Sequence, residues 1–192
     1  DTTLTMFDDG AHNDGAAADD QYGATIPGQA IKTLVRFKVE ATNGSGTSSS
    51  PGIDDSMNYN GYYVKDPSVT SAAPILEWFI PEAEYQDMYD DANLLITDQH
   101  EAVIVYGNEV YDNSSVRVKG SNTLQAFKKS IKVDLPAGHT LTYPGITTAI
   151  KEFHLNANVS SQNAAKVPTV QWAMKQAGLS SPDTELTQLQ RN

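Results

Sequence analysis

The chain has 192 residues and contains no cysteine. Disulfide frameworks and zinc sites built on thiolates are excluded, because both need cysteine sulfur. The sequence also has no run of about 18 or more apolar residues, the length that a membrane-spanning helix requires. The first residues, DTTLTMFDDG, lack the basic start and apolar run of a signal peptide. These absences predict a chain without a membrane span and leave its compartment open.

Basic residues are scarce. Lys and Arg number 13 against 24 Asp and Glu, so the formal net charge is −11. A surface of this sign repels the phosphate backbone of nucleic acids and the anionic lipids of a membrane. We therefore expect no nucleic-acid partner. The hydrophobic content of 39% is ordinary for a globular protein and argues against disorder of the whole chain.

The first part of the chain has the pattern of short strands separated by turns. Up to residue 42, clusters of Gly and Asp alternate with short runs of β type. Segment 33–42, TLVRFKVEAT, alternates apolar and polar side chains, which predicts a half-buried strand. Segment 43–52, NGSGTSSSPG, predicts a loop or linker because of its Gly and Ser content. A boundary between two parts of the chain is expected near residues 60–72.

The second part has the pattern of a sheet with short helices. PILEWFI predicts a strand, and Pro81 begins a predicted helix, since the first helical turn tolerates a missing N–H. Two β-branched runs that flank Gly107 and Asn108 predict a β-hairpin. The segments VRVKG and KKSIKVDL are expected to continue the same sheet.

The last part predicts one more helix. Residues 168–177 have apolar side chains at helical spacing, and Gly178 is placed to cap the helix end. The polar segment 179–192 has no obvious partner, and we expect it to complete no element.

Five aspartates lie among glycines in the segment DDGAHNDGAAADDQYG. They are Asp8, Asp9, Asp14, Asp19 and Asp20. Clustered carboxylates suit Ca²⁺, which takes about six to eight oxygen ligands. The spacing differs from that of an EF-hand loop, and Asp–Gly pairs are common in tight turns. A calcium site and simple turn formation are therefore both open for this segment.

Segment 114–136 concentrates positive charge within an acidic chain. Its basic residues are Arg117, Lys119, Lys128, Lys129 and Lys132. Strand alternation places Lys129 on the same face as the apolar Ile131 and Val133. Burial of an unpaired lysine is costly, so Lys129 either extends to solvent or contacts an anion such as a phosphate or a carboxylate.

Four short motifs occur in a fixed order: VRVKGSNT, KKSIKVDLPAGH, KEFHLNAN and a helix that ends in QAG. This order resembles that of the CotH kinase-like family, the spore-coat kinases, over about residues 73–180. Residues 1 to about 63 resemble the end of the immunoglobulin-like β-module that often precedes this domain. The resemblance implies an α+β fold. Residues 1–65 would be a partial immunoglobulin-like β-sandwich segment, and residues 73–192 an incomplete kinase-like N-lobe with an antiparallel sheet and short helices.

The resemblance also implies ATP-dependent phosphorylation of coat or other surface proteins, with ATP and Mg²⁺ as cofactors. Lys128 and Lys129 match the lysine pair of the family, and they are the implied ligands of the nucleotide phosphates. Lys129 is favoured because it faces inward. Arg117 and Lys119 match the strand and turn beside this pair.

Two hypotheses for function follow from the resemblance. The catalytic and metal-binding Asp residues of the family lie after the matched segment, so we expect a fragment of an exported kinase whose signal lies upstream. Phe127 replaces the usual Pro of the family, and Pro168 falls inside its unbroken helix, which it would cut or kink. These departures favour the alternative, a non-catalytic assembly or adhesion module of a cell surface or spore coat.

Overall fold

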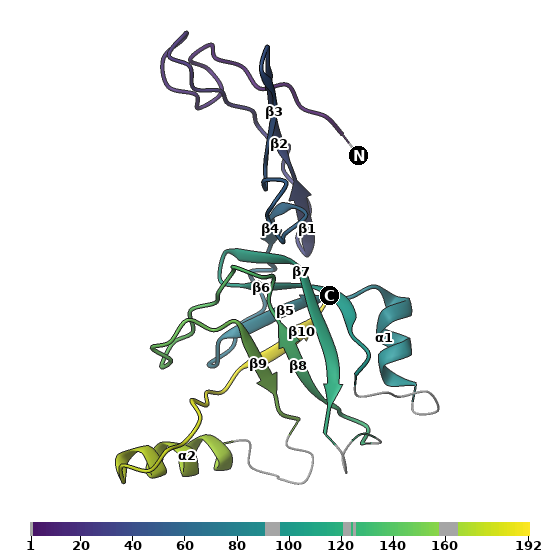
Figure 1. Cartoon of the computed structure of the whole chain (residues 1–192), viewed down its shortest axis with the longest axis vertical. Helices are drawn as coiled ribbons and strands as arrows, with labels where there is room; N and C mark the ends of the chain where they lie inside the picture. The colour runs from purple at the N-terminus through teal and green to yellow at the C-terminus, as the bar shows by residue number, and fades with distance from the viewer. Residues whose placement is uncertain (1, 91–96, 121–123, 125, 158–164) are drawn as a thin grey trace.

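The structure is a computed structural model, which describes residues 2–90, 97–120, 124, 126–157 and 165–192. The described part is mostly β, with two short helices. Figure 1 shows an extended region, residues 2–64, above a curved sheet of six strands that forms half of a barrel.

The extended region contains two small antiparallel sheets. Its strands are β1 (Thr33–Phe37), β2 (Val39–Asn43), β3 (Gly46–Ser50) and β4 (Asn60–Val64). β1 pairs with β4, and β2 pairs with β3. The strand expected over 33–42 is therefore divided at Lys38 between two sheets.

The expectation that segment 43–52 is only a loop is wrong, because residues 46–50 form strand β3. A tight turn explains the difference. The side chain of Asn43 accepts a hydrogen bond from the N–H of Ser45 over 2.8 Å, and Gly46 has a φ of +147°. The Gly- and Ser-rich sequence thus forms a hairpin through backbone pairing, with little side-chain burial.

The six-stranded sheet has the strand order β10-β5-β6-β7-β8-β9. Its elements are β5 (Ile75–Phe79), α1 (Glu82–Tyr89), β6 (His100–Tyr106), β7 (Glu109–Lys119), β8 (Ser130–Asp134), β9 (Glu152–Leu155), α2 (Lys166–Gln176) and β10 (Gln188–Arg191). Strands β5 to β9 are antiparallel neighbours in chain order. β10 lies parallel to β5, so the sheet is mixed, whereas an antiparallel sheet was expected.

Most of the elements expected in this region are confirmed. The strand after Pro74, the helix after Pro81 and the β6–β7 hairpin are present, and Gly107 has a φ of +60° in the hairpin turn. Gly178 caps the end of α2 with a φ of +74°. The expectation that segment 179–192 completes no element is wrong. β10 pairs with the edge of β5, and its Leu189 packs against the core.

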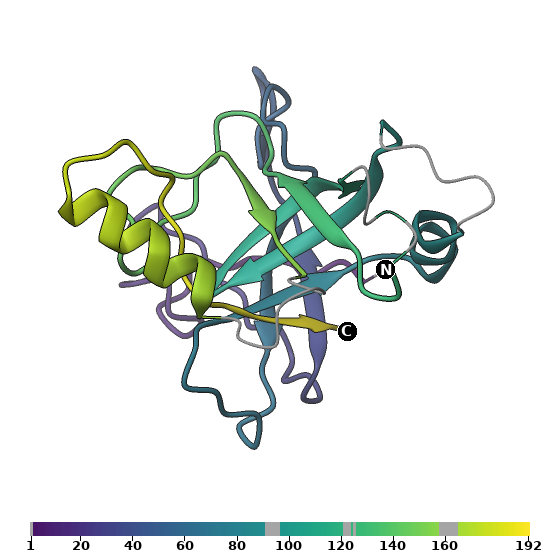
Figure 2. The same ribbon diagram turned by 90° about the horizontal axis from the view of Figure 1, so that it is seen from below.

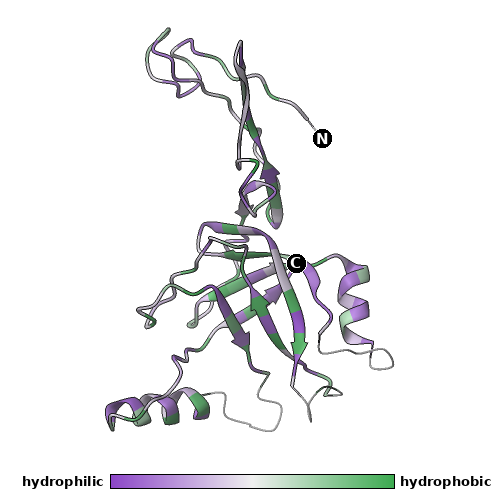
Figure 3. Cartoon of the chain, in the orientation of Figure 1, coloured by the Kyte–Doolittle hydropathy of each residue, from purple (hydrophilic) through white to green (hydrophobic). Residues whose placement is uncertain are grey.

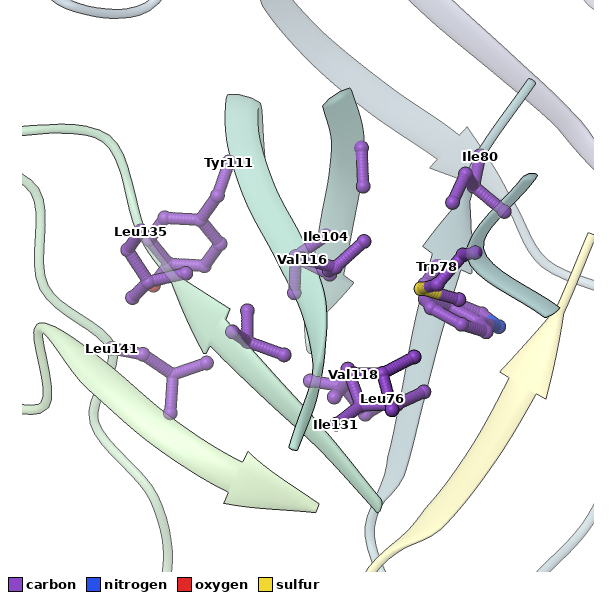
Figure 4. Packing of buried hydrophobic residues seen from close by; sticks show 13 residues of the cluster. Leu76, Trp78, Ile80, Ile104, Tyr111, Val116, Val118, Ile131, Leu135 and Leu141 are labelled. Carbon is purple, nitrogen blue, oxygen red and sulfur yellow. The ribbon is translucent and has the colours of Figure 1, made fainter. Parts of the chain in front are cut away.

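The concave face of the sheet holds the main hydrophobic core. Alternate residues of β5, β6, β7 and β8 point inward, as Figure 4 shows for Leu76, Ile104, Val116 and Ile131. The remaining buried members are Trp78, Ile80, Met88, Ala102, Tyr111, Val118, Val133, Leu135 and Leu141. Strand alternation, with every second residue apolar, is what fixes the inner face.

A second cluster joins the extended region to the back of the sheet. Val103, Val105 and Val110 form its buried part, and Leu34, Tyr63 and Phe79 pack against them. A β-bulge lies beside this cluster, because Asp112 and Asn113 of β7 together oppose Val103 of β6. Asn113 has a φ of +61°. The bulge changes which face of the sheet the following residues occupy.

Helix α2 lies away from the sheet in both views (Figures 1 and 2), and none of its described residues is buried. Pro168 is in its first turn, where a missing N–H is tolerated. The cut or kink expected from Pro168 is therefore not seen in the described residues.

Across the described ranges, neither helix combines the length and the apolar character that crossing a membrane would need.

Candidate functional site

Lys129 lies on the inner face of the sheet, just before β8. Its side chain is buried, with the residue 4% exposed, and this confirms the inward placement predicted from strand alternation. Its Nζ donates a hydrogen bond to the carbonyl oxygen of Leu124 over 2.5 Å. The ring centroid of Tyr89, on α1, lies 5.6 Å from the same atom. Lys129 therefore does not extend to solvent.

The surroundings of Lys129 suit a cation that has lost its water. A carbonyl oxygen and the face of an aromatic ring both present partial negative charge to the ammonium group. Burial raises the pKa of the Tyr89 hydroxyl to about 12, so this ring carries no charge at neutral pH. The electrostatic contribution of Tyr89 to Lys129 thus comes from the ring and not from a phenolate.

The other basic residues predicted to bind nucleotide do not gather around Lys129. Arg117 and Lys119 lie opposite Lys132 and Ser130 in the β7–β8 ladder, and their side chains are on the outer face of the sheet. Lys128 is exposed. The structure therefore divides the predicted set between two faces, with Lys129 inside and Arg117 and Lys119 outside.

The outer face has its own polar row across β7, β8 and β9. Lys119 Nζ lies 2.6 Å from Nδ1 of His154, on β9. Burial lowers the pKa of His154, and the positive charge of Lys119 lowers it further. At neutral pH the imidazole is therefore neutral and accepts a hydrogen bond from Lys119.

Lys132 lies in the same row but is differently paired. It contacts Asp134 over 2.7 Å and Glu152 over 2.8 Å. Hydrogen bonds to these two carboxylates raise the pKa of Lys132. In the described part of the chain Lys119 has no carboxylate within ion-pair distance, so its charge is less neutralised than that of Lys132.

A cleft of about 690 Å³ runs along β9 and reaches the segment before β10. Lys119, His154 and Asn156 line it, together with acidic residues that include Asp183 and Glu185. His154 is not among the site residues predicted from the sequence. The alternation in KEFHL carries a usable signal, because it sets Glu152 and His154 opposite the apolar Phe153.

The aspartate-rich segment forms a loop closed by the bridge between Phe7 and Gly23. Asp14 is buried and accepts hydrogen bonds from the backbone N–H groups of Asp9, Gly10 and His12, over 2.5, 2.9 and 3.1 Å. Burial raises the pKa of Asp14, but these N–H donors outweigh it, and the net shift is downward.

The neighbouring aspartates have a similar role. Asp8 accepts from the N–H groups of Ala18, Asp19 and Asp20, and Asp19 accepts from those of Ala16 and Gln21. Within the described ranges, no three His, Asp or Glu side chains converge in a way that could hold a metal ion. This geometry favours the turn interpretation, and calcium binding stays a prediction.

A comparison with protein families finds no family that matches the chain, and a comparison with curated proteins finds no match. The resemblance to the CotH kinase-like family rests on the order of the four sequence motifs alone.

Proposed function

We propose that the six-stranded sheet is the nucleotide-binding lobe of an exported CotH-like protein kinase, and that Lys129 binds the phosphates of ATP. The observation that carries this proposal is the burial of Lys129 on the inner face of an antiparallel run of strands, with α1 beside it. The proposed substrates are proteins of a coat or cell surface.

The chemistry of phosphoryl transfer supports a role for such a lysine. The reaction depends on positioning and on positive groups that are already in place around the phosphates. Lys129 is held by the start of β8, and its ammonium is already desolvated. A phosphate oxygen would replace the Leu124 carbonyl as acceptor, and it would be a stronger acceptor because it is charged.

The arrangement of the elements supports the same proposal. Strands β5 to β9 form an antiparallel meander with α1 after its first strand, and in this proposal the sheet is the N-lobe of the kinase. Residues 1–65 would then be the end of an immunoglobulin-like module. ATP would bind with Mg²⁺, as the resemblance implies, and we assign no catalytic base among the described residues.

Calorimetric titration of the chain with ATP and Mg²⁺ tests the proposal. Lys129→Ala should weaken binding by about tenfold or more, the equivalent of one hydrogen bond to a charged group. Lys132→Ala is the matched control, because Lys132 lies on the outer face and is paired with Asp134 and Glu152. Equal losses in both variants would indicate nonspecific attraction of charge and would contradict the proposal.

A non-catalytic assembly module is the second candidate, and α2 is the observation that favours it. Val170, Trp172 and Met174 of this helix are exposed, Trp172 by 63%. Figure 3 shows apolar residues distributed along α2, which lies away from the sheet. Apolar side chains in this position are typical of a surface that binds another protein. Wild-type protein that fails to bind ATP at millimolar concentration would favour this candidate.

A further inference from the structure

A second cavity, of about 590 Å³, lies at the junction between the extended region and the sheet. Its walls come from the end of β4, the segment 65–74, β5, β10 and the tip of the β6–β7 hairpin. They are mostly apolar and aromatic, with Tyr63, Pro74, Val105 and Tyr106 among them. The cavity shares no lining residue with the cleft along β9.

One buried carboxylate, Glu77, faces this cavity. Glu77 lies on β5 between Leu76 and Trp78, which both point into the main core, so its own side chain is on the opposite face. Its neighbours across the sheet are Gln190 and Val105, and both line the cavity. The residue is 6% exposed.

Glu77 has one hydrogen-bond donor among the described residues. The side-chain amide of Asn192 donates to its Oε2, and Tyr63 and Gln190 each donate to the Oδ1 of Asn192 over 3.3 Å. In the part of the chain that the structure describes, no Lys, Arg or His lies within ion-pair distance of Glu77. Lys65 also lines the cavity, and Asp66, another lining residue, is paired with Lys32 over 3.4 Å. Among the described residues the buried carboxylate thus has no counter-charge within ion-pair distance, which is a costly arrangement.

We propose that this cavity binds an organic cation, an ammonium or guanidinium group on a short apolar stem. Glu77 would accept a charge-assisted hydrogen bond from the cation. Tyr63 lies on the same side of the sheet as Glu77, with the second cluster, and the apolar walls enclose the stem. The volume is within the range of about 300–1,000 Å³ that is usual for small-molecule sites. The two carboxylates Glu77 and Asp66 outnumber Lys65 among the charged lining residues, so a phosphate or other anion would be disfavoured here.

Such a cation has two sources, a free small amine or a Lys or Arg side chain of a polypeptide. Calorimetry with n-butylamine, L-arginine, a capped Ala-Lys-Ala peptide and the neutral n-butanol, each added to the whole chain, separates these cases. The amine should bind saturably and n-butanol should bind at least about tenfold more weakly, since it cannot supply the charge. Stronger binding of the peptide than of free amines would indicate a protein ligand.

Two variants make the test specific. Glu77→Gln keeps the shape and removes the charge, and it should weaken butylamine binding by about tenfold. The control Glu40→Gln, which removes an exposed carboxylate on β2, should leave binding unchanged. Thr70→Trp, at an exposed part of the wall, should block the cavity even if Glu77→Gln does not fold. The proposal is overturned if amine and alcohol bind alike, if wild type binds no amine, or if binding survives Thr70→Trp.

Discussion

Arg36 on β1 donates a hydrogen bond from Nη1 to Oδ1 of Asp112 on β7, over 3.3 Å. The other oxygen of Asp112 accepts from the backbone N–H of Asn58 over 3.2 Å, and the residue is only 1% exposed. Both donors belong to the extended region, whereas the carboxylate belongs to the sheet. The β-bulge of β7 thus provides one polar attachment between the two parts of the chain.

Asp112→Asn should lower the free energy of unfolding by about 1–3 kcal/mol. The asparagine amide has one acceptor oxygen in place of two, so it cannot accept from both Arg36 and Asn58, and its own NH₂ group is buried without an acceptor. Urea denaturation followed by circular dichroism measures the change. Lys32→Met, which removes the exposed partner of Asp66, should cost less than about 1 kcal/mol. Equal small losses in the two variants would show that Asp112 does not attach the two parts.

Gly61 on β4 provides a separate test of the same junction. A Cβ added there would lie 2.9 Å from the carbonyl oxygen of Val35 and 3.0 Å from Cγ1 of Val110. Gly61→Ala should therefore destabilise the protein by about 1–3 kcal/mol through overpacking. Gly28→Ala is the control, since a Cβ at Gly28 meets nothing within 4 Å. A melting temperature that is unchanged in Gly61→Ala would mean that β4 does not pack against Val110 in solution.

The contact between Lys119 and His154 has a pH signature. Burial and Lys119 hold the pKa of His154 below its ordinary value of 6.5, so the unfolded chain binds this proton more readily than the folded chain. The contribution of neutral His154 to the free energy of unfolding is complete above pH 6.5. It is lost as the pH falls through the pKa of His154 in the folded protein. NMR titration of His154 should show the lowered value, and Lys119→Met should raise it. Lys128→Met is the control and should leave it unchanged; an identical titration in all three proteins would exclude the contact.

Thermal melts with Ca²⁺ and with a chelator distinguish calcium binding from simple turn formation in the aspartate-rich loop. If Asp8, Asp14 and their neighbours bind Ca²⁺, the melting temperature should rise with Ca²⁺ and fall with a chelator, because the ion would bind the folded state only. An unchanged melting curve would remove the calcium prediction and leave the turn interpretation.

The same loop should respond to acid. Because the net pKa shift of Asp14 is downward, its stabilising effect is complete above the ordinary value of 3.8 and is lost as the pH falls through the lower folded value. Asp14→Asn should make the loop more sensitive to proteases at neutral pH, and the exposed Asp54→Asn should not. Equal digestion rates for wild type and Asp14→Asn would contradict a structural role for this carboxylate.

The hydrophobic alternation of single segments was enough to predict much of the sheet. It predicted the β6–β7 hairpin and the placement of Lys129 on the apolar face of β8, but not that the side chain of Lys129 would be buried. Strands β3 and β10 were not predicted. Their sequences are polar, and they are stabilised by backbone hydrogen bonds to a neighbouring strand, which amino-acid composition does not indicate.

The candidate sites depended on information that one segment cannot supply. Alternation places Lys129 on the face of Ile131, but only the pairing of Val118 with Ile131 shows that Lys119 lies on the opposite face of the same sheet. The burial of Glu77 requires β10 and the extended region to come together around β5. Long-range contacts of this kind are outside the reach of periodicity and motif spacing.

Strand β10 has a consequence for how the chain is made. Gln188 pairs with Ile75, so one edge of β5 waits for a segment synthesised much later, while β5 to β9 can pair neighbour by neighbour. An open strand edge on a nascent chain is a template for pairing with other molecules. Segment 188–191 therefore covers the edge of β5 only after it has been synthesised. Until then the open edge exposes the growing protein to aggregation.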